Sequence, residues 1–222
     1  MSESMVVSAF LAFSGGFQDA YTFIARGGVF ANAQTGNVVL MSTSFLQGKW
    51  RVGLLYLYPI LAFVAGVFMS YVVENRFHFS RKLHWRQVVL MVEIGILLVV
   101  GFLPVNRNIP ANALVSFSCA MQVQAFRTVG GGIPYASTMC VGNLRGGTAA
   151  LAKAIFHKDA AQFHKSLYYF AVILIFALGA GVGALLSMHA SRHIIWVCCA
   201  LLSVAAFLMD LDRKRFKKQE RI

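Results

Sequence analysis

The chain has 222 residues, of which 58% are hydrophobic and only 13% are charged. Soluble globular domains carry roughly 25% charged residues, so this composition argues against a soluble fold. A formal net charge of +12 would favour nucleic-acid binding in a soluble protein. Here the basic residues lie in short segments between apolar runs, where they act as topology signals, and nucleic acid is therefore excluded as a partner.

Six apolar runs approach or exceed the roughly 20 residues that a helix needs to cross a bilayer. They span residues 5–25, 52–73, 87–103, 111–128, 163–188 and 194–209. The segment before the first run lacks the basic residues of a cleavable signal peptide, so we expect this run to be a retained helix. Two further apolar stretches, 34–47 and 139–156, are shorter or more basic.

The basic residues predict which ends of these helices face the cytoplasm. Lys and Arg cluster in 75–86 and in the tail 211–222, so both segments should be cytoplasmic and an even number of crossings should separate them. Four of the six runs lie between them. A crossing by 139–156 would make the number odd, so we expect this stretch to dip in and return, or to lie along the interface. By the same logic 34–47 does not cross, and both termini are cytoplasmic.

The two halves of the chain show a weak internal repeat. A shift of 106 positions aligns Gln18 with Gln124, Thr22 with Thr128, and the pair Gly36-Asn37 with Gly142-Asn143. Each half has three crossings, so two halves in series must have opposite orientations. We therefore predict an all-α membrane protein of about six transmembrane helices, built as two inverted three-helix repeats that each hold one short non-spanning helix.

This prediction describes a single transmembrane domain over 1–222. Repeat one covers about 5–104, repeat two covers about 111–210, and 211–222 forms a basic tail. Inverted repeats with short or broken helices are typical of transporters and channels, whose solute site lies near the membrane midplane.

Four stretches also resemble a known family. They read Phe13-Ser-Gly-Gly-Phe-Gln-Asp-Ala-Tyr-Thr-Phe, Gln34-Thr-Gly-Asn-Val, Met121-Gln-Val-Gln-Ala-Phe-Arg and Thr138-Met-Cys-Val-Gly-Asn-Leu-Arg. They resemble the YoaK family of bacterial inner-membrane proteins, over nearly the whole chain. The resemblance implies an inner-membrane location and the repeat, and it names no substrate. Members often have Thr-Gly-Asn in both halves, whereas this chain has Val141 in place of the second Thr.

Asp19 is the first candidate for chemistry, because a carboxylate deep in a membrane helix should be paired, protonated or in contact with water. It can be a proton-coupling or cation-contact residue, or it can pair structurally with Arg127 or Arg26. Arg127 itself is either a cytoplasmic anchor or a gate and anion contact. Glu93 is a possible second proton carrier or a structural partner of a neighbouring helix.

Glycines and asparagines mark the second group of candidates. Gly15 and Gly16 either unwind the first helix beside Gln18 and Asp19 or allow close packing. The two Gly-Asn pairs should lie in the first turn of the short helices, where helix N-termini attract anions, or serve as ordinary caps. The predicted solute or ion pathway comprises Gln18, Asp19, Thr22, Asn37, Gln124, Arg127, Thr128 and Asn143.

Other residue types point to packing rather than to chemistry. The small residues Gly179, Gly181 and Gly183, like Ala62, Gly66 and Ser70 in the first half, should form close helix contacts inside the bundle or between protomers. The four cysteines are interpreted as small apolar filler. The pairs His189/His193 and His157/His164 lack further ligands, so no metal and no other cofactor is expected.

We therefore expect an inner-membrane transporter or channel for a small polar or anionic solute, with proton coupling as one form of it. The expected partners are the lipid bilayer, the solute and, in an oligomer, further copies of the chain. The alternative is a non-transporting scaffold or accessory subunit, whose polar residues would lie in dry contacts between helices. An enzyme is not expected, because no catalytic motif occurs in the sequence.

Overall fold

The computed structural model describes residues 4–77, 84–129, 132–189 and 192–219, and it describes side chains as far as residue 211. This part of the chain is almost entirely helical, as the sequence predicts. Its elements are α1 (Met5–Ala25), α2 (Gln34–Leu46), α3 (Trp50–Phe77), α4 (Trp85–Phe102), η1 (Val105–Arg107), α5 (Asn108–Ala125), β1 (Thr128–Val129), β2 (Ile133–Pro134), α6 (Cys140–His157), α7 (Ala160–His189), η2 (Arg192–Ile195) and α8 (Trp196–Gln219).

Within the described residues, four helical stretches are long and apolar enough to cross a membrane. They are Trp50–Phe77, Trp85–Phe102, Ala160–His189 and Arg192–Leu211. The other two predicted crossings correspond to α1 and α5, whose buried faces hold several glutamine, serine and other polar residues. That α1 and α5 also cross the membrane stays a prediction.

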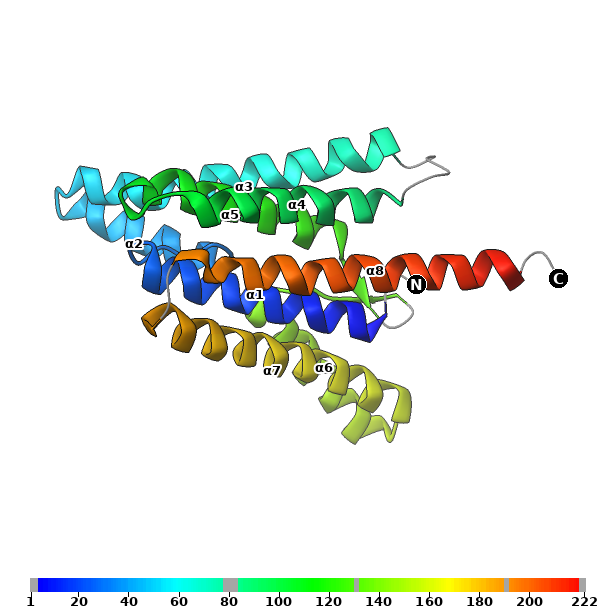
Figure 1. The fold of residues 1–222 in the computed structure, drawn as a ribbon. Coiled ribbons are helices and arrows are strands. Elements are labelled where there is room, and N and C mark those ends of the chain that lie inside the picture. Colours follow the sequence, from blue (N-terminus) through cyan, green and yellow to red (C-terminus); the bar gives the residue numbers. More distant parts are fainter. Residues whose placement is uncertain (1–3, 78–83, 130–131, 190–191, 220–222) are drawn as a thin grey trace.

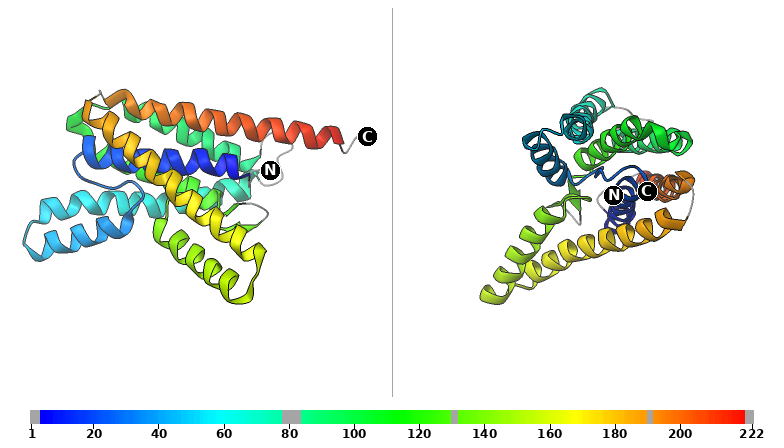
Figure 2. Two further views of the ribbon diagram at one scale, coloured as in Figure 1. Left: turned by 90° about the horizontal axis from the view of Figure 1, so that it is seen from below. Right: turned by 90° about the vertical axis from the view of Figure 1, so that its left-hand side faces the viewer.

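The hydrophobic core lies among α1, α4, α5 and α8, where Leu11, Leu90, Val115 and Leu202 are fully buried. The helices α3 and α7 lie outside this core on opposite sides of the bundle (Figure 1), and α7 is clearly tilted relative to α1 (Figure 2). Both leave large apolar side chains on their outer faces. Such extensive exposed apolar surface is expected where a protein meets lipid.

The outer helices α3 and α7 each pack on an inner helix of the opposite half. The helix α3 lies along α5, and α7 lies along α1, in the two most extensive helix interfaces of the structure (Figure 2). A Cβ atom at Gly66 would collide with the Phe117 carbonyl, and one at Gly179 would collide with the Phe13 carbonyl. These contacts confirm the predicted role of Gly66 and Gly179 and place them inside the chain, whereas the expected close contact of Gly181 within the bundle is wrong, because a Cβ atom there would meet open space.

The helix α1 runs without interruption through Gly15 and Gly16. Of the two interpretations of this glycine pair, unwinding is wrong and close packing is confirmed. A Cβ atom at Gly16 would meet the Phe176 carbonyl of α7, and one at Gly15 would meet the side chain of Thr138. The glycines therefore bring α7 and the loop before α6 close to α1.

The short helices α2 and α6 each form a hairpin with the helix that follows. The α2–α3 turn and the α6–α7 turn lie at opposite ends of the bundle (Figures 1 and 2). The helix α1 begins at the same end of the bundle at which α8 finishes (Figure 1). Neither short helix is among the four stretches that could cross a membrane.

The helix α5 spans Asn108–Ala125, so it begins and ends three residues earlier than the predicted run 111–128. The following residues leave the helix, and Val129 pairs with Ile133 in a two-stranded antiparallel hairpin. Gly132 in this connection has a φ of +103°, a conformation that glycine adopts without a steric penalty. The expectation that Arg127 and Thr128 lie on a membrane helix is therefore wrong.

Candidate functional site

A cavity of about 800 Å³ is bordered by the N-terminal ends of both α2 and α6. Residues of α1, α3 and α7 complete its wall, which is mainly apolar and includes the rings of Phe23, Phe63 and Phe176. Its polar lining residues are Asp19, Asn32, Gln34, Thr35 and Thr138. The cavity therefore offers an apolar body with a small number of polar groups, as small-molecule sites usually do.

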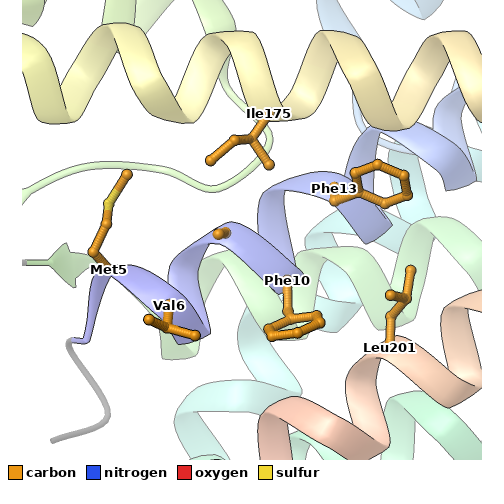
Figure 3. A pocket seen from close by; sticks show the side chains of 7 residues that line it. Met5, Val6, Phe10, Phe13, Ile175 and Leu201 are labelled. Atoms are coloured by element: carbon orange, nitrogen blue, oxygen red, sulfur yellow. The ribbon is translucent and has the colours of Figure 1, made fainter.

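A second hollow of about 390 Å³ lies between α1, α7 and α8 (Figure 3). Figure 3 shows Phe10 and Phe13 projecting from α1, with Ile175 of α7 on one side of the hollow and Leu201 of α8 on the other. All of the residues that line it are apolar. It offers no group that could recognise a polar solute, so the cavity beside α2 and α6 is the candidate functional site.

Asp19 is the acidic residue on the wall of this cavity, with 7% of its surface exposed. Its Oδ1 accepts the backbone N–H of Asn32 at 2.7 Å, and Asn32 Nδ2 donates to the Gly15 carbonyl at 3.2 Å. The loop before α2 is thus tied to α1 through the carboxyl group. Asn32 Oδ1 is buried and has no hydrogen-bond partner in the described structure.

The two ion pairs considered for Asp19 do not form. Arg26 is almost fully buried, and it donates to the carbonyls of Val100, Leu103 and Pro104 at 3.0 to 3.2 Å. Its Nε also donates to the Tyr21 hydroxyl at 2.8 Å. Arg26 therefore caps the C-terminal end of α4, where the helix dipole favours a cation.

Arg127 instead pairs with Glu74 of α3, with 3.6 Å between Nη2 and Oε2. Its side chain is 55% exposed. This position fits the interpretation as an anchor near the end of the bundle. Arg127 does not line the cavity, so the expected gate or anion contact is not supported by its placement.

Asn37 and Asn143 lie in the first turns of α2 and α6, as predicted. Asn37 Nδ2 donates to the Phe30 carbonyl at 2.8 Å, and its Oδ1 accepts the Phe30 N–H at 3.1 Å. Asn143 makes the same two bonds with Ala136, at 2.6 Å and 3.2 Å. Both the asparagines and their partners are 106 positions apart in the sequence.

These paired bonds, which we call the asparagine locks, correct the expectation that both side chains contact the solute. Each amide group is occupied by the backbone of the preceding loop, and neither asparagine lines the cavity. A lock fixes the distance and direction between the loop and the start of the short helix. The two asparagines therefore position the loops and helices that border the cavity, although their own side chains do not line it.

Gln18 belongs to a buried network beside the cavity. Its Nε2 donates to Glu93 Oε1 and to Ser14 Oγ, both at 3.0 Å, and its Oε1 accepts the Cys119 thiol at 2.9 Å. Gln122 reaches the same carboxyl group from α5. The network spans α1, α4 and α5, so Cys119 does more than fill space.

The shift of 106 positions selected Gln124, whereas the glutamine in the network is Gln122. Gln124 is only half-buried and does not line the cavity. The stretch Gln122-Val123-Gln124 of α5 contains two glutamines that residue type alone cannot distinguish. Only the rotation of the helix determines which of them faces the network. Sequence reasoning also missed Asn32 and Thr138, because each looks like an ordinary polar loop residue.

The two predicted threonines lie away from the cavity wall. Thr22 Oγ1 donates to carbonyls of its own helix, those of Gln18 at 3.0 Å and Asp19 at 3.1 Å. Thr128 lies in β1, outside a membrane helix. Among the described residues, no group of three or more His, Cys, Asp or Glu side chains is arranged to hold a metal ion.

Comparison with known proteins identifies the family of the chain. No curated protein and no solved structure matches the chain. The resemblance to the YoaK family accordingly stays a prediction. A family model with the description "Protein of unknown function (DUF1275)" matches residues 7–208, a range that contains the cavity, both asparagine locks and the glutamine network. The chain therefore belongs to the DUF1275 family.

Proposed function

We propose that the chain is an inner-membrane transporter or channel for a small polar or anionic solute, and that the cavity between α2 and α6 is its solute site. The observation that carries this proposal is Asp19, a buried carboxyl group on the wall of a cavity that both short helices border. Within the described residues Asp19 has no ion-pair partner. Contact with a hydrated cavity would account for a carboxyl group at this depth.

The proposal includes an inverted repeat, and three observations support it. The asparagine locks recur after 106 positions. The contact of Gly66 with Phe117 and that of Gly179 with Phe13 are counterparts, because each joins an outer helix to an inner helix of the other half. The two short-helix hairpins extend toward opposite ends of the bundle (Figure 2). Solute sites of such repeats lie at their interface.

The proposed orientation places both termini in the cytoplasm. The end of the bundle at which α1 begins and α8 finishes also holds the α6–α7 turn (Figure 1). The sequence around that turn is basic, with Lys153, Lys158 and Lys165, and so is the tail after residue 211. An excess of Lys and Arg favours the cytoplasmic side.

The chemistry of the cavity favours an anion that binds together with a proton. Asp19 accepts the backbone N–H of Asn32 in the loop before α2, and the first turn of α6 has no acidic residue. The N-terminal residues Cys140, Val141 and Gly142 of α6 border the cavity. An anion seated there is repelled by an ionised Asp19 and tolerated by a protonated one. Proton–anion cotransport therefore follows as the specific form of the proposal.

A scaffold or accessory subunit is the second candidate, and the glutamine network is the observation that favours it. Gln18, Glu93 and Gln122 are enclosed and hydrogen-bonded between helices, as the scaffold hypothesis expects. The scaffold hypothesis gives no role to the cavity. Hydration of that cavity therefore separates the two candidates.

Cys140 provides a built-in probe of cavity hydration. It lines the cavity and is half-buried, whereas Cys119, Cys198 and Cys199 are buried. A charged, membrane-impermeant methanethiosulfonate reacts with a thiolate, which forms only in contact with water. We expect this reagent to modify Cys140 in proteoliposomes and Cys140→Ser protein to stay unmodified.

Leu174→Cys in the Cys140→Ser background is the matched control. Leu174 is 62% exposed in the bundle but lies on the outer face of α7, away from the cavity. A cysteine there should face lipid and stay unreactive. Failure of Cys140 to react, or equal reaction at position 174, would overturn the proposed solute cavity.

A further inference from the structure

Glu93 is a fully buried carboxyl group that does not line the cavity. The titratable groups around it are Cys119 on α5 and Cys198 and Cys199 on α8, and Asp19 on α1 lies near Cys119 in turn. In the described part of the chain, no Lys, Arg or His side chain forms an ion pair with it. Its charge therefore depends on the neutral groups that donate hydrogen bonds to it.

Gln18 is a fixed donor to this carboxyl group. Its Oε1 accepts the Cys119 thiol, so its Nε2 must face Glu93 Oε1 and Ser14 Oγ. Rotation of this amide would bring its oxygen against Glu93 and its nitrogen against the thiol. The Gln18 amide therefore donates to the carboxyl group in one fixed orientation, which does not change with the charge of Glu93.

Gln122 differs from Gln18, because each orientation of its amide suits a different charge state of Glu93. One end of the amide lies 3.1 Å from both Glu93 oxygens, and the other lies 3.0 Å from Ser137 Oγ. With the nitrogen toward Glu93, the amide donates to an ionised carboxylate and accepts from Ser137. With the oxygen toward Glu93, it can accept only from a protonated carboxyl group, and its nitrogen donates to Ser137.

We propose that Glu93 is a second proton-binding residue of the transport cycle, and that rotation of the Gln122 amide passes its charge state to Ser137 before α6. Acidification adds a proton from solvent to one Glu93 oxygen, and the new O–H donates to Gln122 Oε1. Return of the proton to solvent restores the carboxylate and the original amide orientation. The transport step rests on the proposed function, whereas the proton site is testable without a solute.

The position of Ser137 explains how this change would reach the solute site. The preceding residue, Ala136, is held by the lock of Asn143, and the following residue, Thr138, lines the cavity. Ser137 is itself 1% exposed, so a reversal of its hydrogen bond is not absorbed by water. A reversed hydrogen bond at Ser137 would therefore act directly on its neighbours Ala136 and Thr138, and through them on the N-terminal end of α6.

Infrared difference spectroscopy on the purified full-length chain tests this inference. A protonated carboxyl group in apolar surroundings gives a C=O stretching band that an ionised one lacks. We expect such a band to appear on acidification and to shift when glutamate is carbon-13 labelled, whereas labelled aspartate should leave it in place. The labelling experiment uses the unmodified chain and therefore does not depend on the folding of a variant.

Five variants, three of them controls, assign the band to the relay. Glu93→Gln should remove it, and Asp19→Asn should leave it. Gln122→Leu should shift its frequency because the carboxyl group loses a hydrogen-bond partner, whereas the matched Gln124→Leu should not. Glu74→Gln, at the other described glutamate, should also leave the band unchanged.

Absence of a pH-dependent glutamate band, or a band unaffected by both Glu93→Gln and Gln122→Leu, overturns the inference. The outcome is independent of the proposed function. A Glu93 band in a chain whose Cys140 stays unreactive would refute the solute cavity and leave the proton site intact. A hydrated cavity without the band would refute the proton site alone.

Discussion

The loop before α2 and the loop before α6 share their hydrogen bonds and differ in charge. Both are closed by an asparagine lock, and both lead into a short helix that borders the cavity. Only the first is held by a carboxyl group, that of Asp19. Counting from the matched glutamines Gln18 and Gln122, the residue of α5 that corresponds to Asp19 is Val123. The comparison shows two loops with matching hydrogen bonds, of which only the first contacts a carboxyl group.

The two arginines that follow α1 and α5 differ in the same direction. Arg26 is 1% exposed and caps α4, whereas Arg127 is exposed and pairs with Glu74. The first half therefore buries a cation and a carboxyl group near the loop, and the second half buries neither at the matched places. This asymmetry is consistent with the proposed transporter, in which the loop before α2 holds the proton-binding residue Asp19 and the loop before α6 leads to the anion site.

The largest expected effect is on coupling, and it comes from Asp19→Asn. In the unmodified chain, binding of an anionic probe such as benzoate should weaken about tenfold per pH unit once Asp19 has lost its proton. The amide of the variant cannot ionise, so binding should become independent of pH. Isothermal titration across a pH series measures both slopes.

A neutral analogue, benzamide, is the control for that measurement, because it should show no pH dependence with either protein. The transport mechanism proposed for Asp19 fails if the variant keeps the slope of the unmodified chain.

The next largest effect should follow from Arg26→Met. The substitution removes the donors to three carbonyls at the end of α4, in surroundings that offer little water. We expect the free energy of unfolding to fall by about 3 kcal/mol. Arg127→Met should cost at most about 1 kcal/mol, because its ion pair is exposed. Unfolding in mixed detergent micelles measures the difference, and equal losses would contradict the asymmetry.

The locks should behave alike in the two halves. Asn37→Asp and Asn143→Asp each lose the amide donor to a loop carbonyl and bring a negative charge close to it. We expect each to lower the free energy of unfolding by about 2 kcal/mol. Detergent unfolding of both variants checks this, with Asn106→Asp in the exposed η1 turn as control. A large loss in one half and none in the other would show that the locks are not equivalent.

The sequence predicted the positions of the helices well, because each long helix is built from a continuous apolar run that is visible in the sequence. The predicted stretches 34–47 and 139–156 closely match α2 and α6. The exception is the end of α5, where three consecutive glycines at 130–132 follow and a hairpin takes Arg127 and Thr128 out of the helix. The end of a run in hydropathy is therefore not the end of the helix.

The candidate site was harder to predict, because it depends on the direction of individual side chains. Of the predicted pathway residues, only Asp19 lines the cavity, and Gln18 lies in the adjacent network. The repeat correctly selected Asn37 and Asn143 as a matched pair. It could not reveal that their partners are backbone groups of Phe30 and Ala136, because any residue type supplies those groups.

The smallest expected effects come from the glycines that join the halves. Gly179→Ala should lower the free energy of unfolding by about 1 to 2 kcal/mol, because the new methyl group meets the Phe13 backbone of α1. Gly66→Ala should do the same against Phe117 of α5. Gly181→Ala is the control, since its Cβ would meet open space and alanine favours the helix. Thermal unfolding in detergent ranks the three variants. A loss at Gly181 equal to that at Gly179 would mean that these substitutions act through the helix itself and not through the contact between halves.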